Sequence, residues 1–306
     1  MEILAFDIGG TQGRCCLATA AGVRSDVAAL QRTPSENGAQ WLARLIGGAR
    51  ALCQTHRVKP RIVSVSFGGP VDNDGRIQSM HVAGWDSIDL QGDLRRRFGA
   101  DVKVENDANA GAVGEFMFGA GRGCRNMAYF TVSTGIGGGV ILNGKLHRGA
   151  HGMAGEFGQF VLDGSPAAAQ YAAGKPGTLE SLACGPGIER EGRAALQRLG
   201  RAIPENFTAK FVFDAARNGE AWAVSVRDAA VAYLARGVAI AICAYDLERV
   251  VIGGGVALAG DTLFVPLRAN VEQFLPHFLE GKCNVERAAL GDYPALMGAV
   301  GIALGS

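Results

Sequence analysis

Four polar residues stand together in the segment Glu105-Asn106-Asp107-Ala108-Asn109, where an apolar run ends and a helical pattern begins. Asn and Asp commonly cap a helix, but a cap requires only one such residue. Capping therefore does not explain the whole set. A carboxylate at this position can accept a hydroxyl proton during phosphoryl transfer, which is the chemistry that we consider first.

A second polar turn, Asp7-Ile8-Gly9-Gly10-Thr11, follows the first apolar run of the chain. A carboxylate at a strand end, followed by a glycine turn, can hold a hydrated Mg²⁺ beside phosphate oxygens. The amides of the turn and the hydroxyl of Thr11 can donate hydrogen bonds to the same oxygens. An ordinary tight turn would use the same residues, so this segment alone leaves both interpretations open.

The segment 133–139, Ser-Thr-Gly-Ile-Gly-Gly-Gly, repeats this arrangement of hydroxyl groups and glycines. Glycine has no side chain, so the amides of such a loop can approach a phosphate closely. The dinucleotide-binding fingerprint does not fit, because the sixth position counted from Gly135 is Val140. The Gly-Lys-Ser/Thr ending of a P-loop is also missing, so a nucleotide site here must be of another type.

The elements that carry these motifs follow one pattern twice. A strand, a glycine turn with a hydroxyl group and a second strand are predicted over residues 3–18 and again over 127–142. This repetition predicts a duplicated α/β unit with one phosphate loop in each half. The expected strands are 3–6, 14–18, 62–67, 102–105, 127–132, 140–142 and 250–252, and the expected helices are 41–53, 110–116 and 296–304, with a mostly helical stretch from 165 to 250.

The composition excludes several other classes of protein. The chain has 306 residues, of which 48% are hydrophobic, and its 30 basic and 29 acidic residues leave a net charge of +1. This balance gives no electrostatic reason to expect a nucleic acid or an anionic membrane as partner. The seven cysteines are scattered and odd in number, which favours reduced thiols over a disulfide framework or a zinc cage.

The N-terminus and the apolar segments indicate the cytoplasm. The first residues show no basic region followed by an apolar stretch and a cleavage site, so we expect no signal peptide. The most apolar long stretch, residues 229–244, contains Arg236 and is too short to span a bilayer, so we expect a buried helix. We therefore predict a cytoplasmic protein without a membrane partner.

Taken together and in order, the motifs resemble the signature of ROK proteins, which are bacterial sugar kinases and related repressors. The resemblance runs from residue 3 to about residue 302 and rests on Asp7-Ile-Gly-Gly-Thr, Glu105-Asn-Asp-Ala-Asn, Ser133-Thr-Gly-Ile-Gly-Gly-Gly, His151-Gly-Met-Ala-Gly-Glu-Phe-Gly, Val251-Ile-Gly-Gly-Gly and Leu290-Gly-Asp. It implies an α/β fold of the actin-like ATPase (ribonuclease H-like) type, with two lobes and a central cleft. The implied lobes are a small one, 1–116 plus 290–306, and a large one, 117–289.

The resemblance also implies roles for single residues. Asp107 corresponds to the family's general base, which takes the proton from the primary hydroxyl of the sugar. The residues implied to bind the sugar are Gly68, Gly69, Asn106, Asp107, Glu156, Gln159 and Glu180. Those implied to bind ATP are Asp7, Gly9, Gly10, Thr11, Gln12, Thr134, Gly135, Gly137, Gly138, Gly254 and Gly255. Asp7 is also implied to hold Mg²⁺ through water.

Two places depart from the family pattern. Gln12 stands where many members have a lysine, which removes a cation near the phosphates. Many members also bind a structural zinc with one histidine and three cysteines. The corresponding residues here are not usual zinc ligands at this spacing, so we expect no zinc; they are Gln159, Tyr171, Ala173 and Thr178. The missing histidine normally also touches the sugar, and Gln159 can still donate and accept hydrogen bonds there.

The implied reaction is transfer of the γ-phosphoryl group of ATP to the 6-hydroxyl of a hexose. Glucose is the first expected substrate, and N-acetylmannosamine is the alternative, because zinc-free members with that specificity resemble this pattern. Gln12 and the lost zinc site also leave open a catalytically weak sugar-binding or sugar-sensing protein. A repressor is less favoured, because its helix-turn-helix domain would precede a motif that here begins at residue 7. The family further implies a homodimer.

Overall fold

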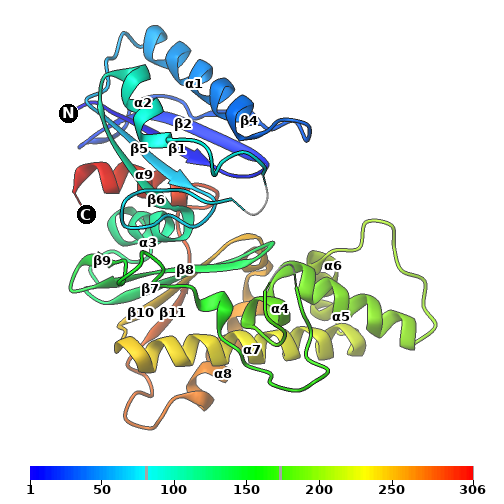
Figure 1. Ribbon diagram of the computed structural model, residues 1–306. Coiled ribbons are helices and arrows are strands. Elements are labelled where there is room, and N and C mark those ends of the chain that lie inside the picture. Colours follow the sequence, from blue (N-terminus) through cyan, green and yellow to red (C-terminus); the bar gives the residue numbers. More distant parts are fainter. Residues whose placement is uncertain (80–81, 172–173, 306) are drawn as a thin grey trace. The chain divides into compact units, whose positions relative to one another are not determined.

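The computed structural model of the protein describes residues 1–79, 82–171 and 174–305 (Figure 1). By their internal contacts, the residues fall into two compact units. Unit 1 comprises Met1–Gly123, Gly139–Ala154 and Asp292–Ser306, and unit 2 comprises Cys124–Gly138 and Gly155–Gly291. The lobe boundaries expected from the sequence, 1–116 plus 290–306 and 117–289, stay a prediction.

Unit 1 is built on a sheet with the strand order β3-β2-β1-β5-β6, in which β4 also pairs with β2. Its strands are β1 (Ile3–Ile8), β2 (Gln12–Thr19), β3 (Gly22–Val23), β4 (Ala28–Gln31), β5 (Ile62–Phe67) and β6 (Asp101–Asn106). Strands β1, β5 and β6 are parallel, and their last residues, Ile8, Phe67 and Asn106, are paired in register. The segments that follow these three strands therefore start from the same edge of the sheet, where α/β proteins commonly bind ligands.

Both faces of this sheet are covered by helices. Along β1 the side chains alternate between the faces. Leu4 and Phe6 belong to a core that includes Trp41 of α1 (Gly38–Thr55) and Leu94 of α2 (Leu90–Phe98). Ile3 and Ala5 point to the other face, where they join a core with residues of α9 (Pro294–Leu304). Burial on both sides explains why β1 reads as a continuous apolar run.

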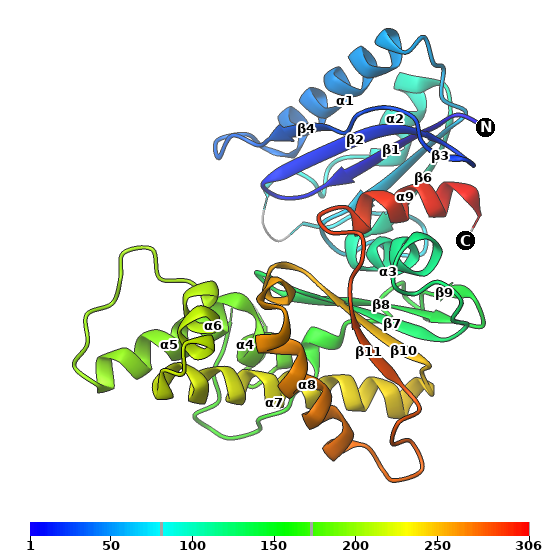
Figure 2. The same cartoon turned by 180° about the vertical axis from the view of Figure 1, so that it is seen from behind.

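Helix α3 (Asp107–Phe118) packs tightly against α9, as both views of the ribbon show (Figures 1 and 2). The two backbones meet at a glycine of each helix: a Cβ atom at Gly298 would lie 1.6 Å from the carbonyl oxygen of Ala110. A Cβ atom at Gly114 would lie 2.2 Å from the oxygen of Pro294. This contact fixes the axis of α3, and the helix starts at Asp107 instead of at the predicted residue 110.

Unit 2 contains three parallel strands in the order β11-β10-β7, with β8 next to β7. They are β7 (Met127–Val132), β10 (Arg249–Gly253), β11 (Asn284–Arg287) and β8 (Ile136–Leu142). Strand β8 runs on into unit 1, where it pairs with β9 (Lys145–His147). Because β8 begins at Ile136, the predicted glycine turn over 133–139 is shorter than expected, and Gly137 and Gly138 lie inside a strand.

The helices of unit 2 lie between Phe157 and Phe274. They are η1 (Phe157–Gln159), α4 (Leu179–Ala183), α5 (Gly185–Arg198), α6 (Ala209–Arg217), α7 (Ala221–Tyr245), η2 (Gly255–Ala259) and α8 (Asp261–Phe274), of which η1 and η2 are 3₁₀ helices. By length and composition, α7 is long and apolar enough to cross a membrane. It packs against α4, α5, α6 and α8, and 12 of its 25 residues are buried, as expected of the core helix that the sequence predicted over 229–244.

Candidate functional site

The start of α3 places Asn106 and Asp107 at the edge of the unit 1 sheet where β1, β5 and β6 end. Asn106 is the N-cap: its Oδ1 accepts hydrogen bonds from the backbone N–H groups of Ala108 and Asn109, at 2.9 and 3.1 Å. Its Nδ2 donates to the carbonyl oxygen of Gly69 at 3.0 Å and to Oδ1 of Asp107 at 3.1 Å. One side chain thus caps the helix, holds the 68–69 turn and orients the neighbouring carboxylate.

The carboxylate of Asp107 is held at the first position of the helix. Its Oδ1 also accepts the backbone N–H of Ala108 at 2.9 Å. A helix N-terminus carries partial positive charge, which attracts a carboxylate at this position. A Cβ atom at Gly68 would lie 3.7 Å from Oδ2 of Asp107, so the turn after β5 passes directly beside the carboxylate.

Glu105 supports this arrangement from inside the protein. Its side chain is buried, and Oε1 accepts hydrogen bonds from the backbone N–H of Asn106 and from Nδ2 of Asn109, both at 3.0 Å. A guanidinium nitrogen of Arg148 lies 2.5 Å from Oε2 and balances the buried charge. The polar residues of this motif therefore have different roles. Glu105 and Asn109 support the backbone from the buried side, whereas Asn106 and Asp107 lie at the edge of the sheet.

The turn after β1 forms a second part of this edge. The backbone N–H of Gly9 donates to the carbonyl oxygen of Gln12 at 2.9 Å, which closes the predicted glycine turn. Asp7 lies on β1, where its Oδ1 accepts from Oγ of Ser66 at 3.2 Å and its Oδ2 from Arg14 at 3.4 Å. Burial raises the pKa of Asp7 above its ordinary value, while the charge of Arg14 acts in the opposite direction.

Arg14 places a cation beside Gln12, where the family lysine is missing. Its NH2 donates to Oε1 of Gln12 at 2.7 Å, and its NH1 donates to the carbonyl oxygen of Asp292 at 2.7 Å. Residues 12 and 14 share one face of β2 because side chains alternate along a strand. The sequence comparison at position 12 alone therefore misses a positive charge that the strand supplies two residues later.

The groups at this edge suit Mg²⁺, which is bound partly by water and phosphate. They do not suit a metal whose ligands are all protein side chains. Mg²⁺ keeps several waters and is commonly bound by one or two carboxylates together with substrate phosphates. Asp7 supplies such a carboxylate, and the part of the chain that the structure describes has no group of three His, Cys, Asp or Glu side chains that could hold a metal. Of the positions where family members bind zinc, Ala173 lies outside the described residues, and the expected absence of zinc stays a prediction.

In unit 2, the loop between β7 and β8 is fixed by three hydrogen bonds. The backbone N–H of Ser133 donates to the carbonyl oxygen of Gly135 at 2.9 Å, and Gly185 donates to the carbonyl oxygen of Ser133 at 2.7 Å. The N–H of Ile136 donates to Oε2 of Glu180 at 2.8 Å. The loop is therefore connected both to the N-terminus of α5 and to the side chain of a residue on α4.

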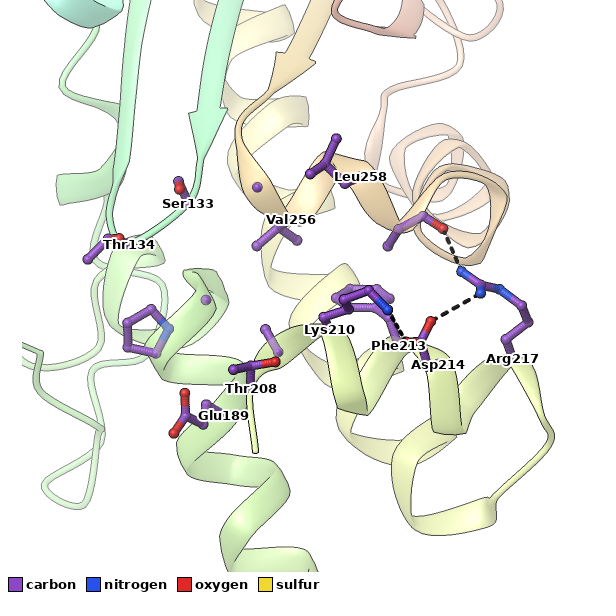
Figure 3. A pocket seen from close by; sticks show the side chains of 15 residues that line it. Ser133, Thr134, Glu189, Thr208, Lys210, Phe213, Asp214, Arg217, Val256 and Leu258 are labelled. Carbon is purple, nitrogen blue, oxygen red and sulfur yellow. Dashed lines mark hydrogen bonds and ion pairs between the residues drawn. The ribbon is translucent and has the colours of Figure 1, made fainter. Parts of the chain in front are cut away.

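This loop forms one wall of a pocket of about 600 Å³ within unit 2, which Figure 3 shows from close by. Ligand pockets commonly have volumes of roughly 300–1,000 Å³. Ser133 and Thr134 lie on one side, and the other walls come from the start of α5, from α6 and from η2. Its lining is partly apolar, with Phe213, Val256 and Leu258. Such a volume and lining suit a heterocyclic base and a ribose.

Gly254 allows η2 to begin at the pocket. Its φ angle is +86°, and a Cβ atom there would lie 2.5 Å from the carbonyl oxygen of Val132. No other residue fits this backbone conformation so close to the end of β7. Gly255 then starts η2 and lines the pocket, and its position beside the nucleotide stays a prediction.

A charged edge on α6 was not expected from the sequence. Asp214 accepts from Lys210 at 2.5 Å and from Arg217 at 3.1 Å, and Arg217 also donates to the carbonyl oxygen of Ala259 at 3.4 Å (Figure 3). The residues of α6 lack a glycine motif, and their spacing of three and four is typical of any exposed helix face. In the sequence, these charged residues are marked only by their helical spacing. That spacing does not show that this face of α6 lines a pocket.

Glu156 and Glu180 come close together in unit 2, near the same loop. Glu156 precedes η1, and Glu180 lies in the first turn of α4, whose Leu179 N–H donates to the carbonyl oxygen of Phe160 at 2.7 Å. Burial raises the pKa of Glu156, and the negative charge of Glu180 raises it further. Gln159, the third residue expected to touch the sugar, lies in η1 and is exposed.

The predicted site residues are thus grouped by the structure into two sets, one in each unit. Unit 1 brings together the turns after β1, β5 and β6 with Asp7, Gly9, Gly10, Thr11, Gln12, Gly68, Gly69, Asn106 and Asp107. Unit 2 holds Thr134, Gly135, Gly137, Glu156, Gln159, Glu180, Gly254 and Gly255. Gly138 differs from these residues, because a Cβ atom there would lie 2.3 Å from the ring of Phe157. Close packing of β8 on that ring accounts for this glycine, and its role in binding ATP stays a prediction.

Residues 3–306 match the model of the ROK family. The chain is 33% identical to a glucokinase of Thermotoga maritima, over 99% of this chain and 97% of the relative. It is 34% identical to an N-acetylmannosamine kinase of Vibrio vulnificus, over 98% and 97% of the two chains. A crystal structure of a ROK family glucokinase from Streptomyces griseus, in complex with glucose and AMPPNP, is similar with a TM-score of 0.80 and 27% identity over 99% of both chains. The predicted α/β fold of the actin-like ATPase type is confirmed by this similarity.

Proposed function

This chain belongs to the ROK family, and on this premise we propose that it is an ATP-dependent sugar kinase that phosphorylates the 6-hydroxyl of a hexose. The observation that carries the proposal is the start of α3. There Asn106 donates hydrogen bonds both to the carbonyl oxygen of Gly69 and to the carboxylate of Asp107, so that the base is held beside a carbonyl oxygen that can accept a hydroxyl. The family relationship and the pocket of unit 2 support ATP as the phosphoryl donor.

In this proposal Asp107 is the catalytic base. Its carboxylate accepts the proton of the 6-hydroxyl while the sugar oxygen forms a bond to the γ-phosphorus. The bond from that phosphorus to the bridging oxygen breaks, and ADP leaves with the electron pair. A general base contributes roughly 10²- to 10⁴-fold to such a reaction. Positioning and charge stabilisation contribute the rest, because phosphoryl transfer needs little covalent chemistry from the protein.

The remaining residues bind and orient the substrates. Glu156 and Glu180 accept hydrogen bonds from hydroxyls of the sugar, and Asn106 contributes by holding the carbonyl of Gly69 and the carboxylate of Asp107 in place. The pocket lined by Thr134 and Gly255 receives the nucleoside, and the turn amides beside Asp7 donate to phosphate oxygens. Mg²⁺, when bound, neutralises negative charge on those oxygens.

Glucose is the substrate that we propose first, and N-acetylmannosamine is the alternative. Two of the relatives described above are a glucokinase and an N-acetylmannosamine kinase at nearly equal identity, 33% and 34%. Identity alone does not decide between them. The catalytically weak sugar-binding protein is a further alternative, although Arg14 restores a cation beside Gln12 and weakens the reason for it. We also propose that the enzyme acts in the cytoplasm, where ATP is available, and as a homodimer, as the family resemblance implies.

Sugar analogues provide the test of this proposal. The release of ADP from ATP is measured with glucose, with 6-deoxyglucose, which lacks the accepting hydroxyl, and with N-acetylmannosamine. Turnover with glucose and none with 6-deoxyglucose is the expected result. Turnover with N-acetylmannosamine alone would replace glucose as the substrate, and turnover with 6-deoxyglucose would contradict transfer to the 6-hydroxyl.

A further inference from the structure

Glu180 contacts the loop that lines the nucleotide pocket. Its Oε2 accepts the N–H of Ile136 at 2.8 Å, and a Cβ atom at Gly135 would lie 2.5 Å from the same oxygen. Ser133 and Thr134, directly before Gly135, line the pocket. The carboxylate therefore fills the space that a side chain at position 135 would take, and it is the acceptor for the first amide of β8.

Glu180 also packs against η1, the 3₁₀ helix that follows Glu156. The Cβ atom that Gly158 lacks would lie 3.4 Å from Cβ of Glu180 and 2.1 Å from the carbonyl oxygen of Ile136. The backbone of η1 therefore packs directly against both Glu180 and the loop. The negative charge of Glu180 raises the pKa of Glu156, which supports the proximity of the two carboxylates.

We infer that Glu180 is a positioning residue that holds the loop 133–136 in the conformation that binds nucleotide, and that it thereby couples sugar binding to nucleotide affinity. A carboxylate has two oxygens, so one can hold the amide of Ile136 while the other accepts a sugar hydroxyl. A bound sugar restricts the rotation of the Glu180 side chain and so orders the loop. This inference rests on the proposed function, because it takes the sugar and the nucleotide as the two ligands.

Coupling of this kind is reciprocal and measurable. A sugar that orders the loop raises the affinity for nucleotide, and the nucleotide raises the affinity for sugar by the same factor. Typical couplings are about 5- to 150-fold. Hydrogen bonds to a charged acceptor are stronger than neutral ones. Removing the bond between the Ile136 amide and the Glu180 carboxylate should therefore weaken the coupling strongly.

The first experiment compares Glu180→Ala with Glu180→Gln in the full chain. The dissociation constant of AMPPNP is measured by calorimetry in the presence of Mg²⁺, with and without glucose. Without sugar, Glu180→Ala is expected to bind AMPPNP about 10-fold more weakly than the wild type, and Glu180→Gln, which keeps an oxygen for the amide of Ile136, is expected to restore most of the affinity. In Glu180→Ala the effect of glucose on AMPPNP binding is expected to vanish. Equal AMPPNP affinity of the wild type and Glu180→Ala without sugar would overturn the inference.

A double-mutant cycle with Gly135→Ala gives an independent test. Among the described residues other than its two chain neighbours, only Glu180 has atoms within 4 Å of the Cβ that this substitution adds. Gly135→Ala should therefore displace the carboxylate and weaken AMPPNP binding as Glu180→Ala does. In the double variant the conflict is gone, so its binding should be no weaker than that of Glu180→Ala. Losses that simply add would contradict the inference.

Two controls separate the possible causes of failure. Gly164→Ala adds a Cβ in unit 2 where no described atom beyond the two chain neighbours lies within 4 Å, and it should bind AMPPNP as the wild type does. Thermal unfolding of each variant shows whether it is folded, and the double variant keeps the test valid if Gly135→Ala alone is unstable. A wild type that does not bind AMPPNP at all would contradict the proposed function, whereas normal wild-type binding with unaffected variants would contradict only the role of Glu180.

Discussion

Nδ2 of Asn106 lies 3.1 Å from Oδ1 of Asp107, so the residue that caps α3 also orients the proposed base. The same nitrogen donates to the carbonyl oxygen of Gly69. The position of the carboxylate therefore depends on helix capping, on the turn after β5 and on the packing of α3 against α9. A substitution that disturbs any of these three features should lower catalytic activity even though the carboxylate of Asp107 is still present.

Replacing Asn106 by alanine should lower both stability and turnover. Loss of an N-cap costs about 1 kcal/mol of stability, and Asp107 loses one of its hydrogen-bond donors. Asn37 offers a matched control, because it caps α1 through a hydrogen bond from the N–H of Gln40 at 3.0 Å. Asn37→Ala should show a similar loss in chemical denaturation with kcat unchanged. Equal kcat values for the two variants would contradict the orienting role of Asn106.

The pH dependence of kcat/KM should reflect Glu156. Its pKa is raised by burial and then by the charge of Glu180, so the carboxylate becomes protonated at a higher pH than an ordinary glutamate. If the charged form binds the sugar, kcat/KM falls as the pH drops through this raised value. Glu180→Gln removes one cause of the shift, and the acid limb of the profile should therefore move to lower pH. An acid limb that stays in place would show that another group controls it.

Asp7→Asn should raise stability and lower activity. The pKa of Asp7 is raised in the folded protein, mainly by burial. Its favourable contribution to stability is therefore present below the ordinary pKa of 3.8 and is lost as the pH rises through the raised value. The neutral amide avoids this loss, so the Tm of Asp7→Asn should exceed that of the wild type at pH 7, with a smaller difference near pH ~4. A lower Tm at pH 7 would mean that the contact with Arg14 outweighs the cost of burial.

Filling the pocket of unit 2 should affect ATP and spare the sugar. Ala209 lies at the start of α6 and lines the pocket. Ala209→Trp should raise the KM for ATP by about 10-fold or more, because the volume for the nucleoside is reduced, while the KM for the sugar changes little. Ala221 is exposed at the start of α7 and is not among the lining residues, so Ala221→Trp is the control. An unchanged KM for ATP in Ala209→Trp would place the nucleotide elsewhere.

The sequence predicts the parts of the candidate site that follow strands. Asp7, Gly68 and Asp107 each come directly after or at the end of an apolar run, and parallel pairing places these ends at one edge. The sequence could not show that α6 forms a wall of the pocket, since Lys210 and Arg217 reach it through the packing of helices far from any motif. Strand β11 (Asn284–Arg287) was also missed from the sequence. Two of its four side chains are charged, and only one side chain is buried.

Gln12 shows how a single position can mislead. Its comparison with the family suggested the loss of a cation, but the period of two along a strand places Arg14 on the same face, with its NH2 2.7 Å from Oε1 of Gln12. Reading position 14 together with position 12 would have predicted this charge. The length of the glycine turn could not be predicted in the same way, because glycine is compatible with both a loop and a strand that packs against the ring of Phe157.

The most direct test of the central claim is the sugar-dependent release of ADP by the wild type and by Asp107→Asn. The panel of acceptors contains glucose, mannose, fructose, allose, glucosamine, N-acetylglucosamine and N-acetylmannosamine. We expect turnover with one of these sugars and a fall in kcat of roughly 10²- to 10⁴-fold in Asp107→Asn, at nearly unchanged AMPPNP affinity. Full turnover by folded Asp107→Asn would contradict the assignment of the base, and folded wild type that releases no ADP with any sugar would contradict the kinase itself.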